Sequence, residues 1–241
     1  MRTLVVIPTY NERENIESIV AGILALGMRD LAVLVVDDAS PDGTGRLADN
    51  LSRNHPESVF VLHRPAKSGL GSAYLDGFRW AMRRDFEAVC EMDADGSHDP
   101  LVLPLLIGAV EKGADLAIGS RRVRGGGIVG WGPHRHLMSW GAMTFSRFLL
   151  GLKTKDITAG FRCYRRAVIE RLLRLPIASG GYAFQEETVF YCERLGFRIV
   201  EIPIVFRDRL QGGSKLAFRE VPAFFSTIMR LRRTAVPAEG N

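Results

Sequence analysis

Short runs of apolar, mostly β-branched residues alternate with longer stretches of mixed polarity along the first half of the chain. Apolar runs of this length between turn-forming residues are typical of buried strands. Strands are therefore predicted at 3–7, 32–38, 59–63, 88–93 and 115–120. The stretches between them have helical periodicity, which predicts helices at 12–26, 44–54, 71–83 and 101–112. This alternation predicts an α/β fold, with a mostly parallel sheet flanked by helices.

The second half of the chain has a less regular pattern. Residues 124–136 are rich in glycine, match neither a strand nor a helix, and are predicted to form a loop. Residues 197–209 alternate like a strand, and Pro203 favours a position at the edge of a sheet. Further helices are predicted at 137–150, 166–174 and 180–196. With no clear linker, we expect a single domain over residues 1–218, followed by a C-terminal amphipathic, basic segment and tail over 219–241.

Polar and acidic residues follow four of the predicted strands, in the stretches PTYNE, DDASPDGT, DADGSHD and GSRR. In the parallel sheets of α/β proteins, ligands bind at the carboxyl ends of the strands. Turns alone would explain the glycine, proline and serine residues, but they explain the repeated carboxylates poorly. One ligand site at this edge of the sheet is therefore predicted.

Glu91, Asp93 and Asp95 occupy alternate positions at the end of the fourth predicted strand. On a strand they would share one face, where three carboxylates repel one another. Either this is a solvated strand end, or a cation lies between the carboxylates. Such a set suits Mg²⁺ or Mn²⁺, which keeps some waters and binds substrate phosphates. A second acidic pair, Asp37 and Asp38, follows another strand, whereas the full calcium-loop pattern is absent.

The chain has 241 residues and a net charge of +5, with 46% hydrophobic and 24% charged residues, so a folded domain is expected. The positive charge suits an anionic ligand, a membrane surface or nucleic acid. Nucleic-acid binding would favour a dense basic run interleaved with aromatic residues, and the chain has none. No nucleic-acid partner is therefore expected.

Some residues bear on location or leave alternatives open. No run of about 18 apolar residues occurs, so no transmembrane helix is expected. Cys90, Cys163 and Cys192 are too far apart for a zinc motif and are expected to be buried, reduced thiols of a cytosolic protein. The stretch KSGLG at 67–71 either receives an anion or is a capped helix start. His98 either donates a hydrogen bond near a phosphate or begins a helix.

Several motifs resemble those of the polyprenol (dolichol) phosphate mannose synthases. They are VVIPTYNERENI, VVDDASPDGT, GLGSAYLDGF, MDADGSHDP, DITAGFRCYRR and EIPIVFRDRLQGGSK. That family belongs to the family 2 glycosyltransferases, which have the Rossmann-like GT-A fold. The resemblance runs from about Thr3 to Leu216, and the DITAGFR and DRLQGGSK blocks favour the polyprenyl-phosphate branch. It implies a metal-dependent, inverting transfer of mannose from GDP-mannose to polyprenyl (dolichyl) phosphate.

The resemblance also implies roles for individual residues. Those matching the positions that bind the guanosine and ribose of GDP-mannose are Pro8, Tyr10, Glu12, Val36 and Asp38. The D-x-D block, which carries the Mg²⁺ or Mn²⁺ ion and the diphosphate, is Asp93, Ala94 and Asp95. The positive residues matching phosphate contacts are Arg121, Arg209 and Lys215. Near the lipid phosphate lie Arg135 and Ser139, together with Arg121. A polar pair near the sugar is Gln185 and Glu187.

The chemistry of the acceptor agrees with this reading. A polyprenyl phosphate is already ionised near neutral pH, because the second pKa of a phosphate monoester is about 6. It needs positive side chains to position it rather than a general base. Two alternatives remain: a polyprenyl-phosphate glucosyl- or other hexosyltransferase of the same fold, and a non-catalytic nucleotide-binding subunit, which the complete D-x-D motif disfavours.

A lipid acceptor implies contact with a membrane surface, on its cytoplasmic face. The segment 219–233 offers apolar residues, among them Phe224 and Phe225, followed by three arginines. The alternatives are that these residues pack on the core, or that a membrane protein anchors the chain. Two features depart from many family members: Gly96 stands where they have leucine, and this sequence has no C-terminal transmembrane hairpin.

Overall fold

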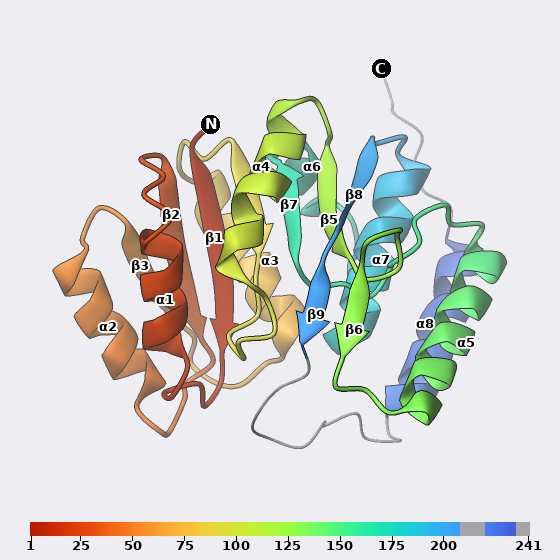
Figure 1. Cartoon of the computed structure of the whole chain (residues 1–241), viewed down its shortest axis with the longest axis horizontal. Helices are drawn as coiled ribbons and strands as arrows, with labels where there is room; N and C mark the ends of the chain where they lie inside the picture. Colours follow the sequence, from red (N-terminus) through yellow and green to blue (C-terminus); the bar gives the residue numbers. More distant parts are fainter. Residues whose placement is uncertain (208–219, 235–241) are drawn as a thin grey trace.

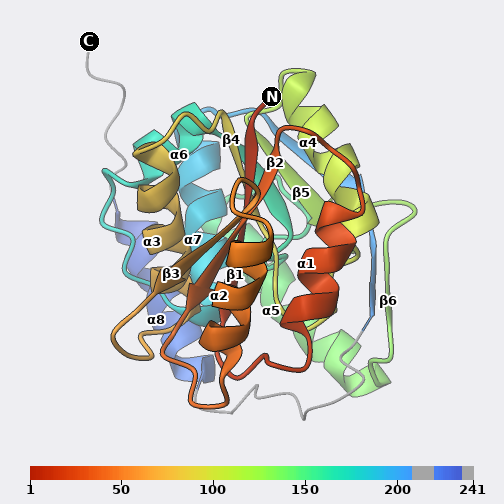
Figure 2. The same ribbon diagram turned by 90° about the vertical axis from the view of Figure 1, so that its left-hand side faces the viewer.

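The computed structural model of the chain describes residues 1–207 and 220–234, without the side chains of residue 182 and residues 220–225. The described residues form a seven-stranded sheet in the order β3-β2-β1-β4-β7-β5-β8, covered by helices on both faces (Figure 1, Figure 2). Its strands are β1 (Thr3–Thr9), β2 (Leu31–Asp37), β3 (Val59–His63), β4 (Ala88–Glu91), β5 (Leu116–Ser120), β7 (Arg162–Arg165) and β8 (Ile199–Pro203). The predicted α/β fold with a mostly parallel sheet is confirmed.

Strand direction brings the predicted ligand loops to one edge of the sheet. Strands β1, β2, β3 and β4 are parallel, and so are β5 and β8. Strand β7 lies between β4 and β5 and runs antiparallel to both. Because it reverses direction relative to each neighbour, β4 and β5 remain parallel to each other. The carboxyl ends of β1, β2, β4 and β5 therefore lie at the same edge.

The sheet is buried on both faces, which explains its continuous apolar runs. Along β1, Leu4 and Val6 join one core cluster, whereas Val5 and Ile7 join the other. One face is covered by α1 (Ile16–Leu24), α2 (Thr44–Asn54) and α4 (Leu103–Glu111), which follows a 3₁₀ turn at Pro100–Val102. The other face is covered by α3 (Leu70–Met82), α6 (Arg166–Leu172) and α7 (Gly181–Arg194). Beside α7 lie α5 (Pro133–Leu150) and α8 (Glu220–Arg233), which pack against each other (Figure 1).

The first-half predictions hold with small shifts at the element ends. The helix at 44–54 matches its prediction, but the first helix begins at Ile16 rather than at residue 12. The backbone N–H of Glu12 donates to the hydroxyl of Thr44 at 3.0 Å. The chain is therefore held against the loop after β2 before α1 begins.

The second half differs from the predictions in three places. The loop predicted at 124–136 is wrong in part, because it contains strand β6 (Gly127–Val129) and Pro133 begins α5. Strand β6 pairs in parallel with β9 (Val205–Arg207), a distant partner that a local pattern cannot reveal. Strand β8 lies at the sheet edge, as predicted, but it ends at Pro203. The single strand predicted at 197–209 is therefore wrong, because Val205–Arg207 form β9 in the other sheet. Strand β7, in the middle of the sheet, was not predicted.

Helix α8 is integrated into the core through two apolar side chains. Ile228 and Leu231 are fully buried and belong to the same core cluster as α3 and α7. For these two residues the core-packing alternative is therefore confirmed. The division of the chain at residue 218 stays a prediction.

Two helical glycines give a matched test of how closely α3 packs on the sheet. A Cβ atom at Gly77 of α3 would lie 2.5 Å from Cγ1 of Val6, whereas at Gly108 of α4 it would meet nothing within 4 Å. We expect Gly77→Ala to lower the free energy of unfolding by about 1–3 kcal/mol through overpacking. Gly108→Ala should raise it by about 0.5–1 kcal/mol, because alanine is the better helix former. Urea denaturation measures both, and shifts of the same sign would contradict the packing described here.

Candidate active site

The loops after β1 and β2 form one bonded unit. The backbone N–H of Asn11 donates to the hydroxyl of Ser40 at 3.0 Å, next to the Glu12–Thr44 bond described above. Asn11 itself has φ of +59°, a left-handed conformation that few residues other than glycine adopt. These bonds give the edge of the sheet a defined shape at its first two strands.

The predicted nucleotide-binding residues divide between this unit and the core. Pro8, Tyr10 and Glu12 lie at the end of β1 and in the loop that follows it, each half-buried. The ammonium group of Lys67 lies 3.7 Å above the centre of the Tyr10 ring, so Lys67 and Tyr10 bring the loops after β1 and β3 together. Val36 is fully buried in the core, so its side chain does not reach a ligand.

Asp38 holds the start of α3 rather than facing the D-x-D motif. Its carboxylate is buried and forms an ion pair with Arg64. The backbone N–H groups of Ser68 and Gly69 also donate to it, each at 3.2 Å. The KSGLG stretch therefore uses these two donors within the protein, which favours the helix-start interpretation of that segment.

Only two of the three alternating carboxylates face the edge of the sheet. Strand β4 ends at Glu91, so the face-sharing predicted for Glu91, Asp93 and Asp95 is wrong. Glu91 is fully buried, whereas the Asp93 side chain is 31% exposed. Burial raises the pKa of Glu91 to about 7, although the nearby charge of Arg162 opposes the shift. Glu91 thus belongs to the interior, beneath the candidate metal ligands.

Two buried side chains fix Asp93. The hydroxyl of Tyr74 donates to its Oδ1 at 3.0 Å, and burial together with the Asp93 charge raises the pKa of Tyr74, so this proton stays in place. Nδ1 of His98 accepts the backbone N–H of Asp93 at 3.1 Å, while the His98 ring stacks on Phe161 at 4.7 Å. Burial lowers the pKa of His98, which keeps the ring neutral and able to accept. His98 therefore shapes the D-x-D turn.

The turn after Asp93 depends on a glycine. Ala94 is packed into the core, and Asp95 accepts the backbone N–H of Ser97 at 3.0 Å. Gly96, between them, has φ of +74°, where a side chain is strained. Glycine at position 96 therefore allows this turn to adopt a left-handed conformation.

A close approach brings the loop before β7 to Asp93. A Cβ atom at Gly160 would lie 3.4 Å from Oδ2 of Asp93 and 3.7 Å from Nε2 of Gln185. The Gln185 amide is almost fully buried and faces this junction. The structure thus brings together Asp93 and Gln185, which lie more than ninety residues apart in the sequence.

Buried Arg162 holds this junction in place. Its guanidinium donates to the backbone carbonyls of Ala159, Ile157 and Gln185 at 2.7, 3.0 and 3.0 Å. It also donates to the hydroxyl of Thr188 at 2.7 Å. Arg162 therefore joins the loop before β7 to helix α7.

Arg121 is bound within the protein. Its side chain forms two hydrogen bonds of 2.7 Å to the buried carboxylate of Asp156 and one of 2.8 Å to Thr158. Burial raises the pKa of Asp156, but these bonds and the Arg121 charge lower it overall. Arg121 joins the end of β5 to the 156–160 loop. The other two predicted phosphate contacts, Arg209 and Lys215, lie outside the described residues.

The predicted acceptor residues lie at the start of α5. Arg135 stacks its guanidinium on Trp131 at 4.1 Å. Ser139 accepts a hydrogen bond of 3.1 Å from Arg122, a residue that the sequence analysis did not single out. Its signal was the GSRR stretch, in which two arginines follow a strand. Arg122 connects the end of β5 to the start of α5.

Glu187, the second residue of the predicted sugar-binding pair, faces away from Asp93. It is fully buried, and its carboxylate forms a 2.8 Å ion pair with Arg230 of α8. Only Gln185 of the pair is therefore near the candidate metal ligands.

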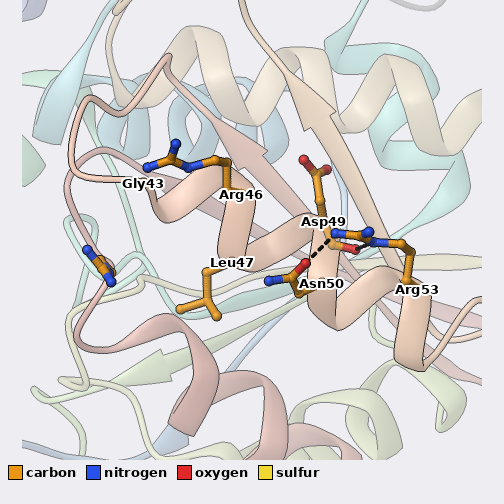
Figure 3. A pocket seen from close by; sticks show the side chains of 7 residues that line it. Gly43, Arg46, Leu47, Asp49, Asn50 and Arg53 are labelled. Carbon is orange, nitrogen blue, oxygen red and sulfur yellow. Dashed lines mark hydrogen bonds between the residues drawn. The ribbon is translucent and has the colours of Figure 1, made fainter.

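A cavity of about 370 Å³ lies on helix α2, apart from the residues above (Figure 3). Three arginines contribute to it, and one of them, Arg53, donates to the amide oxygen of Asn50 on the same helix. Its lining is Arg13, Gly43, Arg46, Leu47, Asp49, Asn50 and Arg53. None of the predicted site residues lines this cavity, so it does not mark the candidate active site.

The donor set fits one kind of metal. Within residues 1–207 and 220–234, no three His, Cys, Asp or Glu side chains are grouped as a metal site. Asp93 and Asp95 offer two oxygen ligands, which suits Mg²⁺ or Mn²⁺ completed by water and substrate phosphate. Zinc would favour three or four nitrogen or sulfur ligands.

Known proteins resemble this chain at the level of sequence. The model of the family described as Glycosyl transferase family 2 matches residues 4–173. The chain is 51% identical over 216 residues to the polyprenol monophosphomannose synthase of Mycolicibacterium smegmatis, covering 90% of this chain and 81% of the relative. It is 50% identical over 217 residues to the undecaprenyl-phosphate mannosyltransferase of Micrococcus luteus, covering 90% and 88%.

Solved structures resemble it at the level of the fold. Glucosyl-3-phosphoglycerate synthase from Mycobacterium tuberculosis, in complex with Mn²⁺, UDP-glucose and phosphoglyceric acid, has a TM-score of 0.70 at 22% identity. The match covers 99% of this chain and 81% of that chain. This likeness confirms the GT-A fold.

Tyr74 offers a test of the candidate metal ligands. We expect Tyr74→Phe to weaken Mn²⁺ binding in the presence of GDP by about tenfold or more, because hydrogen bonds to metal ligands typically contribute this much. Ser52→Ala is the control, since the hydroxyl of Ser52 donates to the carbonyl of Val59 on β3 rather than to a candidate site residue. Calorimetry measures both affinities, and equal losses in the two variants would contradict a specific role for Tyr74.

Proposed function

This chain belongs to glycosyl transferase family 2, and we propose that it transfers mannose from GDP-mannose to a polyprenyl monophosphate, with inversion. Polyprenyl-phosphate mannose synthesis is supported by the two relatives at 51% and 50% identity. We further propose that the mannose donor is GDP-mannose and that the configuration at the anomeric carbon is inverted.

The observation that carries the proposal is the position of Asp93 and Asp95. They follow β4 at the carboxyl edge of the sheet, and Tyr74 and His98 fix Asp93 there. Gln185 faces the same junction. Two oriented carboxylates beside a polar amide suit the diphosphate and sugar of a nucleotide-sugar donor.

The reaction needs little acid–base chemistry from the protein. A phosphate oxygen of the acceptor forms a bond to the anomeric carbon of mannose, and the bond from that carbon to the diphosphate breaks to release GDP. The acceptor is already ionised near neutral pH. His98 cannot act as a base toward it through Nδ1, which the Asp93 N–H occupies. When bound, Mg²⁺ or Mn²⁺ would neutralise part of the charge that develops on the diphosphate.

The acceptor phosphate is assigned to the start of α5. Arg122 and Arg135 provide positive charge there, and Ser139 provides a hydroxyl. Arginine forks bind phosphate oxygens in pairs, which orients the phosphate as well as attracting it. Arg121 stabilises the neighbouring 156–160 loop through Asp156, so its contribution to phosphate binding is indirect in the conformation described.

A donor panel tests the proposal. The chain is incubated with a short polyprenyl phosphate, Mn²⁺ and either GDP-mannose or UDP-glucose, and the lipid products are identified by mass spectrometry. We expect polyprenyl-phosphate mannose from GDP-mannose alone. Glucosyl transfer from UDP-glucose in its place would replace this assignment with the hexosyltransferase alternative, and no transfer from either donor would favour a non-catalytic role.

Removal of a metal ligand tests the metal assignment. We expect Asp95→Ala to lower the rate of mannosyl transfer by on the order of 10³-fold, because the charge on the leaving diphosphate loses its main support. EDTA should have the same effect, reversed by excess Mn²⁺. Asp99→Ala is the control, since Asp99 is exposed and accepts the N–H of Leu101. Near-normal transfer by Asp95→Ala would contradict the metal assignment.

Helix α5 supplies the surface that meets the membrane. Within the described residues, no helix has the length and apolar character needed to cross a bilayer. Leu137, Trp140 and Phe148 of α5 are 68%, 56% and 86% exposed, and their spacing places them on one side of the helix. Arg135 and Ser139 lie in the first two turns of the same helix, so the acceptor phosphate would be bound close to this surface. The positive net charge suits an anionic bilayer.

This assignment moves the membrane contact away from the segment 219–233. Two of its apolar residues, Ile228 and Leu231, are buried in the core, although Met229 is 43% exposed. The side chains of Phe224 and Phe225 lie outside the described residues. Helix α5 therefore exposes more large apolar side chains than the described part of α8 does.

Liposome sedimentation tests the role of α5. We expect Trp140→Ser with Phe148→Ser to reduce binding to anionic liposomes strongly, since burial of an exposed large apolar side chain contributes about 1.5–3 kcal/mol. The melting temperature should change little, because both side chains are exposed. The matched control is Leu101→Ser with Leu105→Ser, a pair 71% and 58% exposed before and within α4. Unchanged binding by the α5 variant would favour anchoring by a membrane protein.

A further inference from the structure

Arg230 of α8 is bound to two groups that belong to α7 and the loop before it. Its guanidinium lies 2.8 Å from Oε1 of Glu187 and donates to the hydroxyl of Ser179 at 2.8 Å. The backbone N–H of Ser179 donates to the other oxygen of Glu187 at 2.9 Å. Three residues from two distant parts of the sequence therefore contact one another through polar groups.

The charges of this set depend on one another. Glu187 is fully buried, and a buried carboxylate that loses its partner is strongly destabilising. The hydrogen bond and charge of Glu187 raise the pKa of Arg230, so the guanidinium stays charged. Within residues 1–207 and 220–234, Arg230 is the cation that pairs with Glu187. Arg230 is therefore the counter-ion that permits a carboxylate at this position of α7.

The same contacts continue toward the candidate metal ligands. The carbonyl oxygen of Ser179 would lie 2.8 Å from a Cβ atom at Gly71, and Phe184 lies 3.0 Å from it, so α7 and its preceding loop rest on the first turn of α3. The ring of Phe184 stacks on Tyr74 at 6.0 Å, with 10° between the planes. Tyr74 donates to Asp93. Packed groups thus connect Arg230 to Asp93 without a gap.

We propose that Arg230 is a positioning residue for the candidate metal site, acting through Glu187, Ser179, Phe184 and Tyr74 on Asp93. The proposal rests on the assignment of Asp93 and Asp95 as metal ligands in the proposed function. By holding α7 against α3, Arg230 keeps the Tyr74 hydroxyl at the distance from Asp93 at which it can donate. The C-terminal helix thereby stabilises a site to which it contributes no ligand.

The test measures metal binding separately from stability. Mn²⁺ affinity in the presence of GDP is measured by calorimetry for the full chain and for Arg230→Met, alongside the melting temperature of each protein. We expect Arg230→Met to weaken Mn²⁺ binding by about tenfold, the lower end of the effect of residues that support metal ligands. Arg233→Met is the matched control on the same helix, since Arg233 is exposed, and it should bind Mn²⁺ like the unaltered chain. Wild-type Mn²⁺ affinity in a folded Arg230→Met variant would overturn the proposal.

Two further variants keep the test decisive if Arg230→Met does not fold. Arg230→Lys retains the charge, and Arg230→Met with Glu187→Gln removes the unpaired carboxylate, so both should fold. In Arg230→Lys, a single ammonium group replaces the guanidinium that contacts both Glu187 and Ser179. In the double variant, no cation contacts Ser179 from position 230. Both should therefore bind Mn²⁺ more weakly than the control, and control-like affinity in both would overturn the proposal. Normal Mn²⁺ binding by the unaltered chain without mannosyl transfer would refute the proposed function and leave this inference intact.

Discussion

The site depends on one buried arginine in the middle of the sheet. Arg162 begins the antiparallel strand β7, has no exposure, and donates to carbonyls of the 157–159 loop and of α7. A buried guanidinium is tolerated only when its donors are satisfied, so the loop and helix are constrained to their positions around it. That constraint sets Gly160 and Gln185 against Asp93, and its charge lies beside buried Glu91.

Most of the sheet could be predicted because its strands are buried on both faces. Continuous apolar runs such as residues 3–7 and 32–38 are typical of buried strands, and each corresponds to a strand of the structure. Strand β7 escaped prediction because RCYR includes two arginines, one of which is buried and donates to distant Gln185 and Thr188 as well as to nearby carbonyls. Strand β6 escaped because its pairing with β9 crosses about eighty residues of sequence. The strands that could not be predicted are therefore those stabilised by contacts with residues distant in the sequence.

The location of the candidate site could be predicted from the sequence, but the contacts of its residues could not. Alternating acids after β4 correctly indicated the edge of the sheet, but the sequence could not reveal that Glu91 faces inward while Asp93 accepts from Tyr74. Arg122 and Arg230 were missed because an arginine has no local signal for the partner it will meet. Neutral His98, likewise, has a role set by packing on Phe161. Chemistry-bearing residue types indicated the candidate site, and the tertiary contacts show what each of these side chains touches.

We propose that Asp93 and Asp95 hold the metal and the diphosphate of the donor at the carboxyl edge of the sheet. A crystal structure of the chain with Mn²⁺ and GDP tests it most directly. We expect metal density beside Asp95 and the diphosphate, with the guanosine near Tyr10. A diphosphate bound instead in the arginine-lined cavity of α2, with no metal at Asp95, would contradict it.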